Sequence, residues 1–114
     1  MVSIKTFLSR INYTPKFISR DLDGCIMVQF RDFVNYAASL EFGTVDIGDG
    51  FQDVYFEIID LRGYRAGNII PLDSPSRKRV IHIKMNTENM DFAASWINDS
   101  LNMLYSKRFS ELDL

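Results

Sequence analysis

The sequence is poor in the residue types that build most catalytic and metal centres. It contains one cysteine, Cys25, and one histidine, His82, among 114 residues. A single cysteine excludes an internal disulfide and fits a reducing compartment. One cysteine and one histidine do not supply the ligand pattern of a zinc site, and no nucleotide-binding glycine motif is present. We therefore expect no metal and no cofactor.

Long apolar segments are also missing. No run approaches the roughly 20 apolar residues that cross a bilayer. The N-terminal stretch lacks the basic segment and unbroken apolar segment of a signal peptide. With 46% hydrophobic and 25% charged residues, the composition is that of a globular domain. We predict one cytoplasmic domain over residues 1–114, with a polar tail from about residue 108.

Net charge is only −2, so the total charge indicates no class of partner. Its distribution is uneven. Residues 25–60 contain one basic and seven acidic residues, a balance of −6, whereas residues 61–85 contain six basic residues and one acidic residue, a balance of +5. An acidic middle segment therefore precedes a basic one.

The apolar periodicity predicts an α+β fold with the order α-β-β-α-β-β-β-α. Ser3 is expected to cap a first helix that ends at Thr14-Pro15. A second helix is expected from Asp32 to Gly43, on the spacing of Phe33, Ala37 and Leu40. The alternative is an extended strand that begins within residues 39–47. The expected strands lie near residues 17–22, 25–30, 53–60, 64–72 and 80–85. They predict one antiparallel sheet of about five strands, with the helices packed on one face.

The last helix is the most clearly amphipathic segment. Asn86 or Thr87 is expected to cap it. Ala93, Ile97, Leu101 and Leu104 follow one face at helical spacing. This helix is therefore expected to cover the sheet.

The segment Asp-Leu-Asp-Gly-Cys-Ile-Met, residues 21–27, resembles the first motif of haloacid-dehalogenase-type phosphatases. That resemblance implies a nucleophile at Asp21 and a general acid and base at Asp23. In that family the motif follows a buried strand of a parallel sheet, whereas Arg20 interrupts the apolar run here. Asp-Gly also favours a two-residue β-hairpin turn. We predict the turn, and no catalytic residue.

An acidic loop contains Asp46 and Asp49, and Asp53 follows it. Carboxylates in a glycine-rich loop are the ligands that calcium prefers, but the spacing of an EF-hand is absent. We predict instead that Asp46, Asp49 and Asp53 form an acidic surface that binds another protein.

A basic strand is the second candidate surface. Arg77, Lys78, Arg79, His82 and Lys84 lie close together in the sequence, and such residues contact nucleic-acid phosphates. Ion pairs with acids on a neighbouring strand explain the same pattern without a ligand. Weak binding of RNA or single-stranded DNA through these five residues is therefore the alternative function.

The sequence favours a small non-enzymatic protein-protein interaction module that acts as an adaptor, inhibitor or chaperone-like accessory protein. Phages and mobile elements encode many such proteins, and we take that origin as a hypothesis. The expected partner is another protein and not a membrane. A homodimer formed through an edge strand stays open as an alternative.

Overall fold

The computed structural model describes residues 2–43, 45, 48–64 and 67–113. It has an α+β fold with a five-stranded antiparallel sheet, a two-stranded sheet, one long helix and one short helix. The elements in chain order are β1 (Val2–Ser3), α1 (Ile4–Ser9), β2 (Phe17–Arg20), β3 (Ile26–Gln29), β4 (Tyr36–Gly43), β5 (Gly50–Phe51), β6 (Asp53–Asp60), β7 (Arg77–Lys84), α2 (Met90–Tyr105) and the 3₁₀ helix η1 (Phe109–Asp113).

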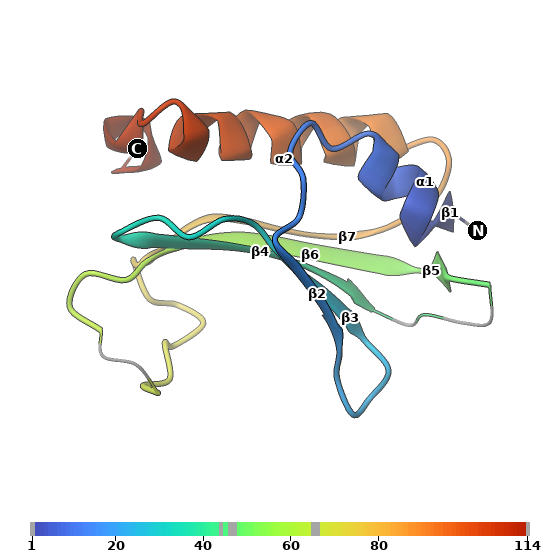
Figure 1. The fold of residues 1–114 in the computed structure, drawn as a ribbon, viewed down its shortest axis with the longest axis horizontal. Coiled ribbons are helices and arrows are strands. Elements are labelled where there is room, and N and C mark those ends of the chain that lie inside the picture. The colour runs from blue at the N-terminus through green and yellow to red at the C-terminus, as the bar shows by residue number, and fades with distance from the viewer. Residues whose placement is uncertain (1, 44, 46–47, 65–66, 114) are drawn as a thin grey trace.

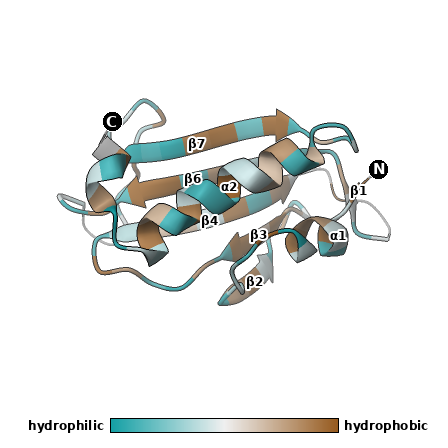
Figure 2. Ribbon diagram, turned by 90° about the horizontal axis from the view of Figure 1, so that it is seen from above, coloured by the Kyte–Doolittle hydropathy of each residue, from teal (hydrophilic) through white to brown (hydrophobic). Residues whose placement is uncertain are grey.

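The large sheet has the strand order β2-β3-β4-β6-β7, and every neighbouring pair is antiparallel. Both α-helices lie on the same side of this sheet (Figure 1). Seen from that side, α2 runs over the central strands, and α1 lies near β3 (Figure 2). The predicted α+β class and the five-stranded antiparallel sheet are confirmed, whereas the two-stranded sheet of β1 and β5 was not predicted.

The core lies between this sheet and α2. Successive strand residues point to opposite faces, so β4 and β6 each turn every second side chain toward the helix. Leu40, Phe56 and Ile58 from the sheet are fully buried there. So are the four predicted helix residues Ala93, Ile97, Leu101 and Leu104. The amphipathic pattern of the last helix therefore predicted its buried face correctly.

The short helix α1 closes one end of the core. Ser3 caps it, as predicted, by accepting a hydrogen bond from the Thr6 backbone N–H at 3.1 Å. Its Phe7 packs edge-to-face against Phe42 and Phe51, with ring centroids 5.8 and 5.7 Å away. Pairing of β1 with β5 holds the start of this helix beside the middle of the chain.

The expected helix over residues 32–43 is wrong, because residues 36–43 form strand β4. Tyr36, Ala38, Leu40 and Phe42 are buried while the residues between them are more exposed, which is the period of a strand. β4 pairs on both sides, with β3 and with β6. Two neighbouring strands therefore outweigh the helix preference of Ala37 and Leu40.

The expected strand over residues 64–72 is also wrong. Among the described residues of this segment, 64 and 67–72, none is in a strand. They belong to the long connection between β6 and β7. β4 supplies the fifth strand of the sheet instead, so the expected element order changes although the number of strands does not.

The C-terminal segment packs where we expected a polar tail. Residues 109–113 form η1, and Leu112 is only 2% exposed. The Phe109 ring stacks on Tyr36 with the centroids 5.1 Å apart. In the described part of the chain, no helix has the length and apolar character that a membrane crossing requires.

Candidate functional site

In the part of the chain that the structure describes, no helix covers the face of the large sheet opposite α2 (Figure 1). Two segments project from the sheet on this side: the β2–β3 hairpin and the connection between β6 and β7. We call the sheet surface between them the open face. It is formed by the side chains that alternate with the buried core residues of β3, β4, β6 and β7.

Both projecting segments present large apolar side chains to solvent. Leu22, at the tip of the hairpin, is fully exposed, and Ile69 and Leu72 in the connection are 91% and 85% exposed. Single exposed apolar side chains are common on protein surfaces. Here they occur on both segments that flank the open face, an arrangement that suits contact with another molecule.

The open face has two shallow hollows. The first, of about 220 Å³, is lined by Glu41, Gly43, Asp53, Tyr55 and His82. The second, of about 340 Å³, lies toward the β3–β4 connection, and small side chains of β4 form part of its floor. Its lining residues are Met27, Gln29, Phe30, Arg31, Asp32, Ala37, Ala38, Ser39 and Ile59.

A nearly buried ion pair lies on the same side of the sheet. Arg77 donates a hydrogen bond to the Glu57 carboxylate, which also accepts the Tyr55 hydroxyl at 2.7 Å. Burial and this carboxylate raise the pKa of Tyr55. Burial alone lowers the pKa of Arg77, but the hydrogen bond and charge of Glu57 outweigh it and raise that pKa. The Arg77 guanidinium is therefore paired within the sheet.

The structure distributes the five basic residues of the predicted nucleic-acid site over two faces. Arg77 pairs with Glu57 on the open-face side, and His82 and Lys84 stand opposite Tyr55 and Asp53 in the β6–β7 register. Arg79 points to the helix side instead. There its guanidinium lies 4.3 Å from the Trp96 ring centroid and donates to the Ser100 hydroxyl at 3.0 Å.

Lys78, the remaining basic residue, stands at an irregularity in the pairing of β6 with β7. Its charge acts on Asp60, whose pKa is lowered first by the hydrogen bond from Arg62 and then, to a smaller extent, by Lys78. Acids of β6 thus face bases of β7 along the strand pair, which is the cross-strand arrangement that needs no ligand.

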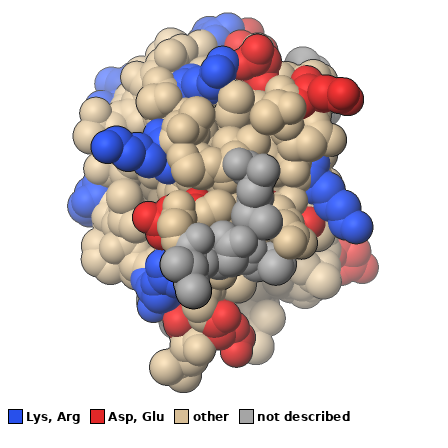
Figure 3. Space-filling view, turned by 90° about the vertical axis from the view of Figure 1, so that its right-hand side faces the viewer, with Lys and Arg blue, Asp and Glu red and all other residues tan. Residues whose placement is uncertain are grey.

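The acidic residues of the predicted partner-binding surface lie on different elements. Asp46 lies outside the described residues. Asp49 is exposed in the loop before β5, with φ of 62°, and its carboxylate is 3.9 Å from Arg20. Asp53 belongs to β6 and lines the first hollow. Lys and Arg side chains are interspersed with Asp and Glu over the end of the molecule that contains β1 and β5 (Figure 3).

The Asp-Leu-Asp-Gly segment forms the hairpin that we predicted, with a longer loop than a two-residue turn. The Asp21 carboxylate accepts backbone hydrogen bonds from Asp23 and Cys25, both at 2.9 Å. Gly24 supplies the left-handed backbone, with φ of 83°, as in hairpins that close through a bulged glycine. The carboxylate thus has a structural role in the turn.

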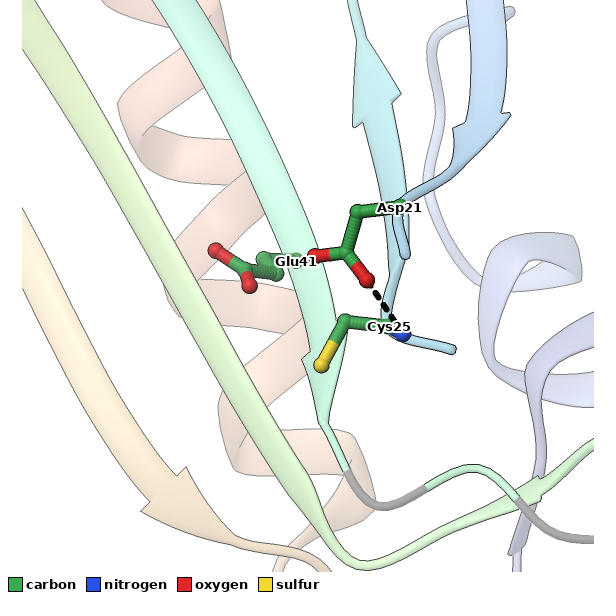
Figure 4. Close-up of side chains that lie close together, drawn as sticks. All are labelled: Asp21, Cys25 and Glu41. Atoms are coloured by element: carbon green, nitrogen blue, oxygen red, sulfur yellow. Dashed lines mark hydrogen bonds between the residues drawn. The ribbon is translucent and has the colours of Figure 1, made fainter. Parts of the chain in front are cut away.

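Asp21, Cys25 and Glu41 form a small cluster of possible metal ligands (Figure 4). One ligand atom from each lies within 4.8 Å of the others. Asp21 is exposed and one of its oxygens already accepts two N–H groups.

Cys25 and His82 are far from each other, since β4 and β6 separate β3 from β7 by roughly 14 Å at about 4.8 Å per strand.

No protein-family model, curated protein or solved structure matches the chain. The chemical properties of the open face are therefore inferred from its own side chains. The sequence does not predict this surface, because the helix expected over residues 32–43 replaces its central strand β4. The alternation of Tyr36, Ala38, Leu40 and Phe42 with small or polar residues was the signal that pointed to it.

Proposed function

We propose that the protein is a non-enzymatic module that binds another protein through the open face. The observation that supports this proposal most directly is the placement of Leu22, Ile69 and Leu72 on the two segments that project beside this face. A partner seated against the sheet is in reach of apolar contacts on both sides. Burial of exposed apolar surface is the main favourable term in protein association.

The centre of the open face suits recognition of a protein surface. Its two hollows combine small side chains with one exposed histidine, one tyrosine and carboxylates. Interfaces commonly combine aromatic anchors with a polar surround of this kind. An adaptor, inhibitor or chaperone-like accessory protein of the cytoplasm fits such a surface, and the acidic residue Asp53 lines one of its hollows.

Weak binding of RNA or single-stranded DNA is less well supported. Arg77 and Arg79 have partners within the fold, and the half-buried Lys78 acts on Asp60. This leaves His82 and Lys84 as the members of the basic set with exposed side chains on the open face. Two such residues make few phosphate contacts, and affinity for nucleic acid grows with the number of phosphates neutralised.

Site-specific photo-crosslinking tests the proposal. A photoreactive phenylalanine analogue replaces Ser39 on the open face, and the matched control places it at the exposed Asp99 of α2. We expect a discrete protein adduct from the Ser39 position in cells that produce the native partner. A second variant, with Leu22→Ser and Ile69→Ser added, should lose that adduct while its thermal unfolding is unchanged.

Two outcomes contradict the proposal. Equal adducts from both positions indicate non-specific contact. An adduct that nuclease removes assigns the open face to nucleic acid, and its loss after Lys84→Ala identifies the basic strand as the binding site.

A further inference from the structure

A separate cavity lies where β4 begins and α2 ends, beyond the open face. It has a volume of about 330 Å³, within the size range of sites that bind small organic groups or apolar side chains. We call it the end cavity. Its lining residues are Asp32, Phe33, Val34, Asn35, Tyr36, Lys107 and Phe109.

Three aromatic side chains line the end cavity and contact other rings. Phe109 stacks on Tyr36 with ring centroids 5.1 Å apart, and Phe33 packs edge-to-face on Tyr105 at 5.2 Å. Arg31 lies over both the Phe33 and Tyr105 rings. Aromatic side chains fixed in this way lose little conformational entropy when a ligand binds.

The rim of the end cavity includes an apolar side chain in full contact with solvent. Val34 is 96% exposed. It does not contribute to the core, and it stands beside an apolar hollow that it can help to close over a bound group. Burial of such a side chain is favourable only when a ligand covers it.

The charges at the rim are unequal. Asp32 forms an ion pair with Lys16 at 2.5 Å. Among the residues that the structure describes, the Lys107 ammonium group has no hydrogen-bond or ion-pair partner. Within the described part of the chain, the end cavity therefore presents one positive charge that no acidic group pairs with.

Lys107 also adopts an unfavourable backbone conformation. Its φ is 56°, and it follows α2 in the hydrogen-bond pattern in which Arg108 N–H donates to the Met103 carbonyl at 2.8 Å. Glycine is the usual residue there, because a side chain adds about 1 kcal/mol of strain. Strained residues of this kind cluster at binding sites.

We propose that the end cavity binds a protein segment in which a large apolar side chain is followed by an acidic residue. The apolar side chain enters between Phe33, Tyr36 and Phe109. The acidic residue pairs with Lys107. Asp32 lines both this cavity and the second hollow of the open face, but Phe33, Tyr36, Lys107 and Phe109 line only the cavity. This inference therefore does not depend on the function proposed above.

The probe is a five-residue peptide, acetylated and amidated, with Phe-Asp at its centre and glycine and serine around it. Binding is measured by ¹H–¹⁵N chemical-shift changes in the full chain. We expect saturable changes at Val34, Lys107 and Phe109, with none at Tyr55 and His82. The Phe-Asn version of the peptide should bind about two- to fivefold more weakly, the usual value of one exposed charge pair.

Variants at exposed positions separate binding from folding. Val34→Ser should weaken the Phe-Asp peptide about tenfold, the value of one lost aliphatic contact, whereas Val80→Ser on β7 should leave it unchanged. Lys107→Gly should raise the melting temperature and yet weaken this peptide to the level of the Phe-Asn peptide. Lys5→Gly, at an exposed position of α1, is the control for loss of a distant charge.

Three results overturn the proposal. The first is the absence of saturable shift changes at millimolar peptide. The second is binding that is equal for both peptides and insensitive to Val34→Ser and Lys107→Gly. The third is binding of 3-phenylpropionate as tight as that of the peptide, which would make the occupant a small carboxylic acid instead of a protein segment.

Discussion

Arg77 and Glu57 form an ion pair between strands β7 and β6, and the two side chains are only 14% and 12% exposed. The same guanidinium donates to the backbone carbonyls of Ile70 and Pro71 at 2.9 and 3.1 Å. Arg77 therefore attaches the β6–β7 connection to the sheet. This side chain therefore helps to position the segment that presents Ile69 and Leu72.

Replacing Arg77 tests this attachment. Arg77→Met leaves the Glu57 carboxylate buried without its partner, so the free energy of unfolding should fall by about 3–5 kcal/mol. Urea denaturation measures this loss. Hydrogen exchange of residues 67–76 should also become faster than exchange in the hairpin at residues 21–25.

The exposed pair of Arg108 and Glu111 supplies the control for that experiment. Arg108→Met should change the free energy of unfolding by less than about 1 kcal/mol. Equal losses in both variants would mean that burial of the Arg77–Glu57 pair has no energetic consequence.

Asp60 makes stability depend on pH in the acid range. Its carboxylate accepts hydrogen bonds from the Arg62 backbone at 2.9 Å and from the Arg62 guanidinium at 2.7 Å, which lower its pKa below the ordinary value of 3.8. The folded state therefore favours the ionised form. Its stabilisation is present above pH 4 and is lost as pH falls through the lowered pKa.

Asp60→Asn removes that contribution. We expect a loss of about 1–2 kcal/mol at pH 7, the value of hydrogen bonds to a charged group. The difference from the native chain should shrink as pH falls below 4. Asp91→Asn, at an exposed ion pair with Arg10, should cost less than about 1 kcal/mol at pH 7. A loss for Asp60→Asn that stays constant with pH would contradict the assignment.

Two glycines should respond to alanine in opposite directions. Gly24 has φ of 83° and no atom within 4 Å of an added Cβ. Gly24→Ala should therefore destabilise the protein by about 1 kcal/mol through backbone strain alone. Gly43, in β4, would place its Cβ at an ordinary 3.5 Å from the Asp53 Cβ. Gly43→Ala should stabilise the protein by about 0.5 kcal/mol, because glycine weakens a strand. Thermal unfolding of both variants measures the two changes in stability. Changes of the same sign would contradict this prediction.

Variants of Arg79 and Lys84 distinguish a charge on β7 that stabilises the fold from one that lies on the surface. Arg79→Ala removes the cation–π contact with Trp96 and the hydrogen bond to Ser100, so the free energy of unfolding should fall by about 1–3 kcal/mol. Lys84→Ala should change it by less than about 0.5 kcal/mol. Chemical denaturation of both variants provides the measurement. A large loss of unfolding free energy for Lys84→Ala, with none for Arg79→Ala, would contradict these assignments.

The segments that were predicted correctly are those with a single strong pattern. The α2 stripe from Ala93 to Leu104 follows helical spacing, and Ile81 and Ile83 alternate as in a strand. In β4, Phe33, Ala37 and Leu40 satisfy helical spacing while Tyr36, Ala38, Leu40 and Phe42 satisfy strand spacing. Pairing with β3 and β6 decided between the two, and pairing between distant strands is not a local property.

The candidate sites were harder to predict than the fold. Charge clustering in sequence grouped Arg77 with Arg79, yet the pleat and the bulge of β7 direct them to opposite faces. The end cavity joins Phe33 to Phe109, which lie in different parts of the chain. Only the position of η1 against the start of β4 brings them together.

The strand order of the large sheet has a consequence for folding during synthesis. Each strand of this sheet pairs with the preceding strand of the sheet along the chain. These pairings can form in the order of translation, as each new strand joins the last strand of the growing sheet. The helix α2 emerges from the ribosome after every strand. The helix-facing side chains Leu40, Phe56 and Ile58 are therefore exposed until α2 has been synthesised. Exposed apolar surface of this kind makes a nascent chain prone to aggregation and dependent on chaperones.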